Sequence, residues 1–192
     1  MRASPAHDQG AAAGQGEPGH DPVYSWYVVA VLSFAGVVAF IDRQIINLLV
    51  EPIKADLGVS DTQISLLQGI AFSLFYAIMA LPLARLSDSG NRKQIIILGA
   101  ICWTIATFTC GLAGGLAVLF VSRMMVGVGE ATLTPGGFSM ISDYFPREQL
   151  SRALSVFTSS SFLGSGLAFI LGGAMIGLFS SWGPIEAPLI GD

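Results

Sequence analysis

Four charged side chains interrupt long apolar stretches of this 192-residue sequence. Asp42 and Arg43 lie within AFIDRQIINLL, and Arg123 and Glu130 lie within LFVSRMMVGVGEATL. A charge at the centre of a bilayer costs roughly 2.5–3.5 kcal/mol, whereas a Leu or Ile contributes only about 0.3–0.6 kcal/mol to insertion. Charged side chains in such segments therefore face a bundle interior or an aqueous cavity and pair with one another. Two acids and two bases predict a polar path across a membrane.

Helices that cross the membrane are needed to position these charges. The chain is 53% hydrophobic and 11% charged, against about 25% charged in globular proteins, and its mean hydropathy is +0.68. These values predict an all-α integral membrane protein. Nine Lys and Arg residues are too few and too scattered for a nucleic-acid surface, so we expect no nucleic-acid partner.

Five apolar segments, each near the roughly 20 residues that cross a bilayer, predict five transmembrane helices within residues 25–180. Their expected spans are about 26–50, 64–86, 94–112, 116–141 and 152–179. Residues 1–24 are rich in Gly, Ala, Pro and Gln, and predict a disordered cytoplasmic tail. Residues 181–192 predict a polar external end.

The distribution of Lys and Arg predicts the orientation of these helices, because cytoplasmic loops are enriched in both. With the N-terminus in the cytoplasm, only Lys54 lies outside. The inside residues are then Arg2, Arg85, Arg92, Lys93, Arg147 and Arg152. We therefore expect a multi-pass protein, in a bacterial inner membrane, with a cytoplasmic N-terminus.

Depth along the helices then predicts how the four buried charges meet. At about 1.5 Å per residue, Asp42 and Arg43 lie about 24–26 Å from the cytoplasmic end of the first span. On the fourth span Arg123 lies about 27 Å deep and Glu130 about 16 Å deep. We therefore expect a ladder of four charges between these helices. A static salt-bridge network is the alternative to a ladder that titrates or contacts substrate.

Small residues recur at four-residue spacing in the fifth span, where they predict close helix packing. Ordinary packing and a sliding contact are both compatible with this ridge. Its members are Ser160, Gly164, Ala168 and Gly172, followed by Gly173 and Gly177.

Two segments resemble signatures of the major facilitator superfamily of secondary transporters. The loop ARLSDSGNRKQ resembles Gly-x-x-x-Asp-Arg-x-Gly-Arg-Lys, and RMMVGVG resembles Arg-x-x-x-Gly-x-Gly. The loop residues that match are Asp88, Arg92 and Lys93, while Ala84, Ser89 and Asn91 depart from the signature. The residues of the second match are Arg123, Gly127 and Gly129.

Three further segments, IDRQ, VGVGEA and SDYFPREQLSRALSVF, resemble the spinster-like subgroup, which includes exporters of lysolipids and sphingoid phosphates. The resemblance implies the first five helices of a six-helix N-terminal half. The resemblance also implies that the sixth helix and the C-terminal half are absent from this chain, and the missing C-terminal half of the same transporter is then an expected partner.

The resemblance implies proton-coupled, alternating-access transport of an amphipathic or anionic small molecule or lipid. Asp42 and Glu130 are the expected proton carriers, because a changing Arg partner can switch a buried carboxyl between protonated and charged states. Arg43 and Arg123 are expected to pair with these acids or with an anionic head group. Another organic anion or a drug is the alternative substrate.

The loop residues Asp88, Arg92 and Lys93 lie too far from the bilayer centre to bind substrate. The resemblance implies that they form a conformational gate, and simple positive-inside anchoring is the alternative. A channel, an intramembrane enzyme and a fragment without independent activity are rival interpretations of the chain. We favour a transporter over an enzyme, because no His lies in any span and Asp42 is the sole Asp within one. We expect no cofactor and no metal.

Overall fold

The computed structural model describes residues 21–181, apart from the side chains of Asp88 and of residues 179–181. Within this part the chain is helical and contains no strand, as the sequence predicts. Five helical segments are long and apolar enough to cross a membrane, which confirms the predicted all-α membrane fold. The five segments are Pro22–Leu48, Asp61–Ser87, Arg92–Gly111, Leu116–Tyr144 and Arg147–Leu178. The predicted tail and external end lie almost wholly outside the described residues.

Helix α1 (Pro22–Leu48) begins four residues before the predicted start, within the segment expected to be a tail. The Asp21 side chain caps it by accepting a hydrogen bond from the Val23 amide at 3.0 Å. Pro22 occupies the first turn, where its missing N–H group costs no helical hydrogen bond. A capped start with a proline therefore extends the helix beyond its apolar segment.

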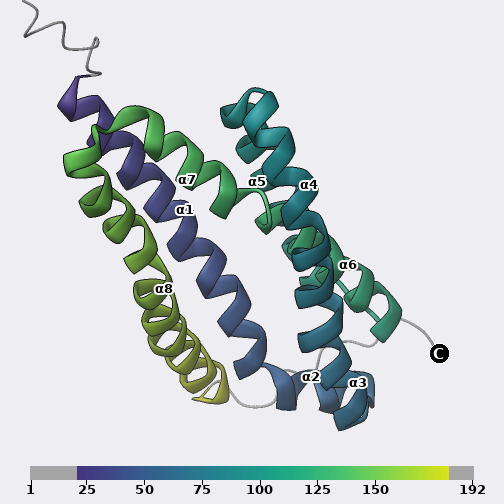
Figure 1. Cartoon of the computed structure of the whole chain (residues 1–192). Coiled ribbons are helices and arrows are strands. Elements are labelled where there is room, and N and C mark those ends of the chain that lie inside the picture. The colour runs from purple at the N-terminus through teal and green to yellow at the C-terminus, as the bar shows by residue number, and fades with distance from the viewer. Residues whose placement is uncertain (1–20, 182–192) are drawn as a thin grey trace, which may run out of the picture.

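A short helix, α2 (Val50–Leu57), follows α1 and ends at Gly58, whose φ of 60° favours glycine. The second span then begins at α3 (Asp61–Leu66), where Ser60 and Gln63 form a reciprocal capping box. Lys54 bridges these elements through ion pairs to Glu51 at 3.6 Å and to Asp61 at 2.6 Å. The charged connection lies at the opposite end of the bundle from the end of α4 (Phe75–Ser89) (Figure 1).

The second span is not one regular α-helix. Between α3 and α4 (Phe75–Ser89), residues Leu67–Leu74 form a π-helical segment, η1. Single π-turns inside α-helices are rare and are frequently found at functional sites. The sequence pattern predicted the span but carried no signal for this change of helical geometry.

The fourth span is divided into α6 (Leu116–Glu130) and α7 (Leu133–Tyr144), whereas the sequence predicted one helix over 116–141. Pro135 cannot donate the backbone hydrogen bond that would continue the helix to Ala131, and its ring crowds that carbonyl. The Thr132 hydroxyl also donates to the Gly129 carbonyl at 2.8 Å, which offers the backbone a local alternative. The helix axis therefore changes direction directly after Glu130 (Figure 1).

Helix α5 (Arg92–Gly111) packs against α6, and α8 (Arg147–Ser181) packs along α1. The predicted small-residue ridge forms the α1–α8 contact. A Cβ on Gly164 would lie 2.7 Å from the Val37 carbonyl oxygen, and one on Gly36 would overlap Ser160. Ala168 is fully buried, while a Cβ on Gly173 would meet no atom within 4 Å. The ridge is therefore a packing surface as far as Gly172.

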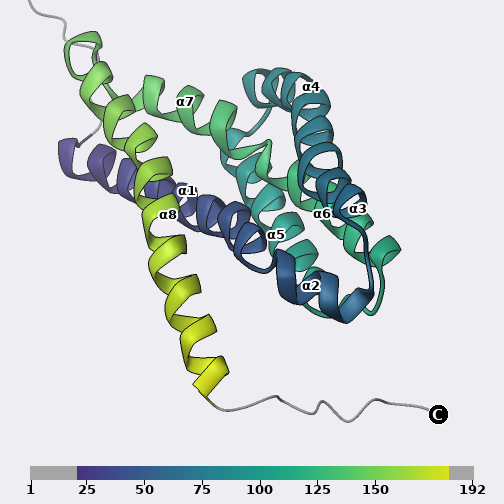
Figure 2. The same cartoon turned by 90° about the horizontal axis from the view of Figure 1, so that it is seen from below.

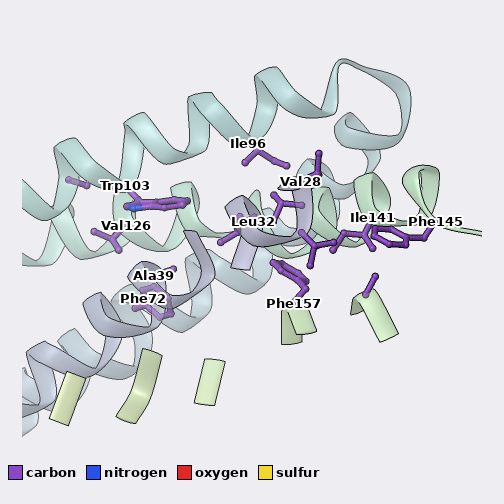
Figure 3. Packing of buried hydrophobic residues seen from close by; sticks show 14 residues of the cluster. Val28, Leu32, Ala39, Phe72, Ile96, Trp103, Val126, Ile141, Phe145 and Phe157 are labelled. Carbon is purple, nitrogen blue, oxygen red and sulfur yellow. The ribbon is translucent and has the colours of Figure 1, made fainter. Parts of the chain in front are cut away.

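One cluster of buried apolar side chains joins α1 and α8 to α5, α6 and α7. Figure 2 shows α8 crossing α1. Figure 3 shows that the cluster extends along the bundle, with Phe72 and Ala39 toward one end and Phe145 at the other. Phe157 of α8 closes against Gly137 of α7, where a Cβ would lie 2.7 Å from its ring. This packing holds α1 beside α6 and α7, the helices that carry the intramembrane charges.

Candidate functional site

The four intramembrane charges form two ion pairs between α1 and α6. The Nε of Arg43 donates to the Oε2 of Glu130 at 2.5 Å. Nη1 of Arg123 lies 3.5 Å from Oδ2 of Asp42. The structure therefore brings together all four residues that the sequence analysis placed in a ladder.

The directions of the side chains explain which charge meets which. The Cα–Cβ bonds of a helix lean toward its N-terminus, and α1 and α6 run in opposite directions (Figure 1). Arg43 therefore leans toward the α6 turn that carries Glu130, and Glu130 leans toward Arg43. The long arginine side chain spans the remaining difference in depth between Arg43 and Glu130. Asp42 lies at about the same depth as Arg123.

The acids of the two pairs differ in their access to solvent. The Glu130 side chain is 0% exposed, against 12% for Asp42. Within the described part of the chain, neither Oε1 of Glu130 nor Nε of Arg123 has a hydrogen-bond partner. A buried polar atom without a partner costs about 1–3 kcal/mol, and more when the group is charged. The site therefore keeps hydrogen-bonding capacity that the two ion pairs do not use.

Aromatic rings surround Arg43. Its guanidinium carbon lies 4.8 Å from the centre of the Phe40 ring, 4.9 Å from that of Phe72 and 4.8 Å from that of Tyr76. A guanidinium over an aromatic face is attracted by the ring quadrupole, by about 0.5–2 kcal/mol according to its solvation. Three rings therefore hold the Arg43 cation independently of Glu130.

Two cavities reach the charges from different directions. One of about 150 Å³ lies between α1, α7 and α8, and both Arg43 and Glu130 line it. A second of about 410 Å³ lies between α1, α2, α5 and α6, and Asp42 and Asp56 line it. Glu130 and Asp42 therefore line separate cavities, although their arginine partners are neighbours.

The residues expected at the gate lie at the far end of the bundle from α2. Arg92 begins α5, donates to the Ser87 carbonyl at 3.3 Å, and forms an ion pair with Asp143 near the end of α7. Lys93 lines a groove beside Tyr24, Tyr27 and Tyr144. Asp88 belongs to α4, but its side chain lies outside the described part of the structure. Arg92 thus links the third span to the fourth through Asp143.

Four contributors to these sites, Phe40, Phe72, Tyr76 and Asp143, were not predicted from the sequence. Phe72 and Tyr76, four residues apart in the second span, share the face that meets Arg43, and this spacing was an available signal. Asp143 could be expected near Arg92, because both lie at the same end of their spans. Their pairing depends on the direction of α7 after the helix break, which sequence periodicity does not provide.

The charge-bearing helices match a known family in sequence. A family model described as Major Facilitator Superfamily matches residues 32–186, a range that contains all four intramembrane charges. The chain belongs to the Major Facilitator Superfamily. Other members of this superfamily are membrane transporters.

Among superfamily relatives, an MFS-type efflux pump of Mycolicibacterium smegmatis is 32% identical over 85% of this chain and 38% of its own length. A sphingosine-1-phosphate transporter of Mus musculus is 31% identical over 80% of this chain and 28% of its own. The crystal structure of a bacterial homolog to the human lysosomal transporter Spinster, inward-facing and occupied, superposes with a TM-score of 0.79. The two sequences are 38% identical, and the match covers 86% of this chain and 37% of the homolog's chain.

These matches confirm the predicted resemblance to the N-terminal portion of a spinster-like superfamily transporter. The chain spans less than two fifths of the length of each of these relatives. Its five membrane helices therefore correspond to the first helices of a longer transporter fold.

Proposed function

We propose that this chain is the N-terminal part of a proton-coupled secondary transporter for an amphipathic anionic molecule. The observation that carries the proposal is the ion pair between Arg43 and Glu130, which lies at the wall of a cavity and leaves one carboxylate oxygen unpaired. An ion pair in the middle of a span is costly to retain, and intramembrane charges of this kind mark proton and substrate paths.

In the proposed cycle a proton binds Glu130, and the neutral carboxylic acid no longer holds Arg43 as an ion-pair partner. Arg43 remains charged, supported by its three aromatic neighbours, and presents its guanidinium to the cavity. An anionic head group then replaces the carboxylate as partner, because the planar guanidinium fits carboxylates and phosphates. Loss of the proton restores the original pair and releases the anion.

Asp42 is the second proposed proton carrier. It lines the cavity between α1, α2, α5 and α6, whereas Glu130 lines the cavity between α1, α7 and α8. Alternating access needs a site that communicates with each side of the membrane in turn. Two acids on two cavities, linked through neighbouring arginines, support such an arrangement.

A lysolipid or sphingoid-type lipid is the proposed substrate class. Phe40, Phe138 and Phe157 line the same cavity as Arg43, so an apolar chain and an anionic head could be held together there. The relative named as a sphingosine-1-phosphate transporter supports this choice. The relative named as an efflux pump supports the second candidate, another small organic anion or a drug.

We further propose a cytoplasmic N-terminus and a cytoplasmic gate formed by Asp88, Arg92 and Lys93. The excess of Lys and Arg at this end of the bundle supports the orientation. The ion pair of Arg92 with Asp143 supports the gate, because it connects the third and fourth spans where they approach each other.

The test uses the full-length transporter that contains this chain, in proteoliposomes with an internal pH-sensitive dye. Radiolabelled sphingosine 1-phosphate is the lipid probe, and a fluorescent organic cation and a fluorescent organic anion are the drug probes. Asp42→Asn and Glu130→Gln should each abolish substrate-linked proton movement, whereas Glu148→Gln, at an exposed acid in the first turn of α8, should leave it unchanged. Unaltered pH dependence in both intramembrane variants would overturn proton coupling, and uptake of the drug probes alone would favour the second candidate.

A further inference from the structure

One aromatic ring is shared by both intramembrane arginines. The guanidinium carbon of Arg43 lies 4.9 Å from the centre of the Phe72 ring, and that of Arg123 lies 5.2 Å from the same centre. Phe72 is 8% exposed and belongs to the main buried cluster. Two cations with different acidic partners therefore rest on a single buried side chain.

The local backbone places this ring with little freedom. Phe72 lies in the π-helical segment η1, and its ring stacks on Tyr76 with centres 5.7 Å apart. Opposite, α6 approaches so closely that a Cβ on Gly127 would lie 2.7 Å from the Phe72 carbonyl oxygen. Gly127 is one turn from both Arg123 and Glu130 on α6. The close approach thus brings the Phe72 ring to the turns that carry the charges.

The pairing of the four charges has a nearby alternative that the structure does not adopt. Asp42 and Arg43 are adjacent in the chain, and either acid could in principle attract either arginine. Instead, each arginine reaches an acid on the other helix. The attraction between a ring face and a cation is directional, so it restricts where each guanidinium can lie.

We propose that Phe72 is a positioning residue that holds Arg43 and Arg123 on a shared ring and thereby assigns Arg43 to Glu130 and Arg123 to Asp42. In a Phe72 variant without an aromatic face, both arginines gain freedom to exchange partners. The consequence for transport rests on the proposed function, because after an exchange of partners either arginine could pair with either of the two proposed proton-carrying acids. The assignment of partners itself does not depend on transport.

Double-mutant cycles on thermal unfolding of the full-length protein in detergent measure the assignment directly. Arg43→Gln with Glu130→Gln reports one pair, and Arg123→Gln with Asp42→Asn reports the other. In the native background both pairs should show coupling. In a Phe72→Leu background both couplings should fall by about half or more, because the shared ring contact is lost. Phe72→Tyr should retain both.

Phe40→Leu is the matched control, because the Phe40 ring contacts Arg43, whereas the ring that meets Arg123 in the described structure is Phe72. It should weaken the Arg43–Glu130 coupling and leave the Arg123–Asp42 coupling unchanged. If Phe72→Leu fails to fold, a trifluorinated phenylalanine at this position keeps the shape of the ring and removes its negative face. Unchanged couplings in the Leu or fluorinated variant, or equal effects of the Phe40 and Phe72 variants, would overturn the proposal.

A transport measurement separates this proposal from the proposed function. With sphingosine 1-phosphate as the probe, Phe72→Leu should alter the pH profile of uptake, and Phe72→Tyr should restore it. If the couplings change while native uptake shows no proton dependence, the proposed function fails and the role of Phe72 stands. If uptake is proton-dependent but Phe72→Leu changes neither coupling nor pH profile, the role of Phe72 fails alone.

Discussion

Arg43 and Glu130 lie 87 positions apart in the sequence, yet the Arg43 Nε donates to the Glu130 carboxylate at 2.5 Å. The two members of the pair are supported unequally. Arg43 retains three aromatic contacts without its partner and is 23% exposed, whereas Glu130 is fully buried and has no second cation within hydrogen-bond distance in the described structure. The effects of removing either partner should therefore differ.

Arg43→Gln should destabilise the protein by about 3 kcal/mol, because it leaves a buried carboxylate without its partner. Glu130→Gln should cost about 1 kcal/mol, since the rings still hold Arg43. The double variant should be more stable than Arg43→Gln alone. Thermal unfolding in one detergent at neutral pH measures all three, and equal losses from both single changes would contradict the unequal support.

Gly164→Ala should destabilise the contact between α1 and α8 by about 1–3 kcal/mol, because the added Cβ would lie 2.7 Å from the Val37 carbonyl oxygen. Gly173→Ala is the matched control on the same helix, and its Cβ would meet no atom within 4 Å. The control should leave the melting temperature unchanged or raise it slightly, as alanine favours a helix over glycine. Similar melting temperatures for both variants would show that the ridge tolerates expansion.

Arg92→Ala and Asp143→Ala should each slow transport while changing stability by less than about 1 kcal/mol, because ion pairs of exposed side chains contribute little to folding. The charge exchange Arg92→Asp with Asp143→Arg should recover part of the lost rate. Initial uptake rates and melting curves of the same preparations provide the comparison. A gate role would be excluded by native rates in both single variants.

The proposed orientation can be tested with single cysteines after Cys102 and Cys110 are replaced by Ala. Glu51→Cys should react with a membrane-impermeant maleimide added outside intact cells, because residue 51 is at the end of the bundle assigned to the exterior. Gln149→Cys should react only after permeabilisation. The reverse pattern would place the N-terminus outside.

The intramembrane charges and their meeting point followed from sequence because two simple rules apply to them. A charge in a span must avoid lipid, and the rise of 1.5 Å per residue sets its depth. Neither rule contains information on side-chain direction, so the pairing of Arg43 with Glu130 rather than with Asp42 required the structure. The small-residue ridge was predictable for the same reason, since close packing in lipid requires small side chains.

Local departures from regular helix could not be derived from hydrophobic periodicity. The π-helical segment that carries Phe72, LQGIAFSL, has the apolar composition of an ordinary membrane helix, so its composition does not predict the change of geometry. The break after Glu130 had a partial signal in Pro135, but the apolar pattern predicts one helix over residues 116–141. The partner of Arg92 and the ring under both arginines depend on these departures, which is why they were missed.

The crossed pairs also have a consequence for electroneutrality. Two carboxylates and two guanidiniums sum to zero formal charge, so the resting site carries no net charge into the low-dielectric centre of the membrane. A proton on one acid leaves one uncompensated positive charge, and a monoanion restores neutrality. A dianionic phosphate would need protons on both Asp42 and Glu130. The number of protons moved per substrate should therefore follow the charge of the head group.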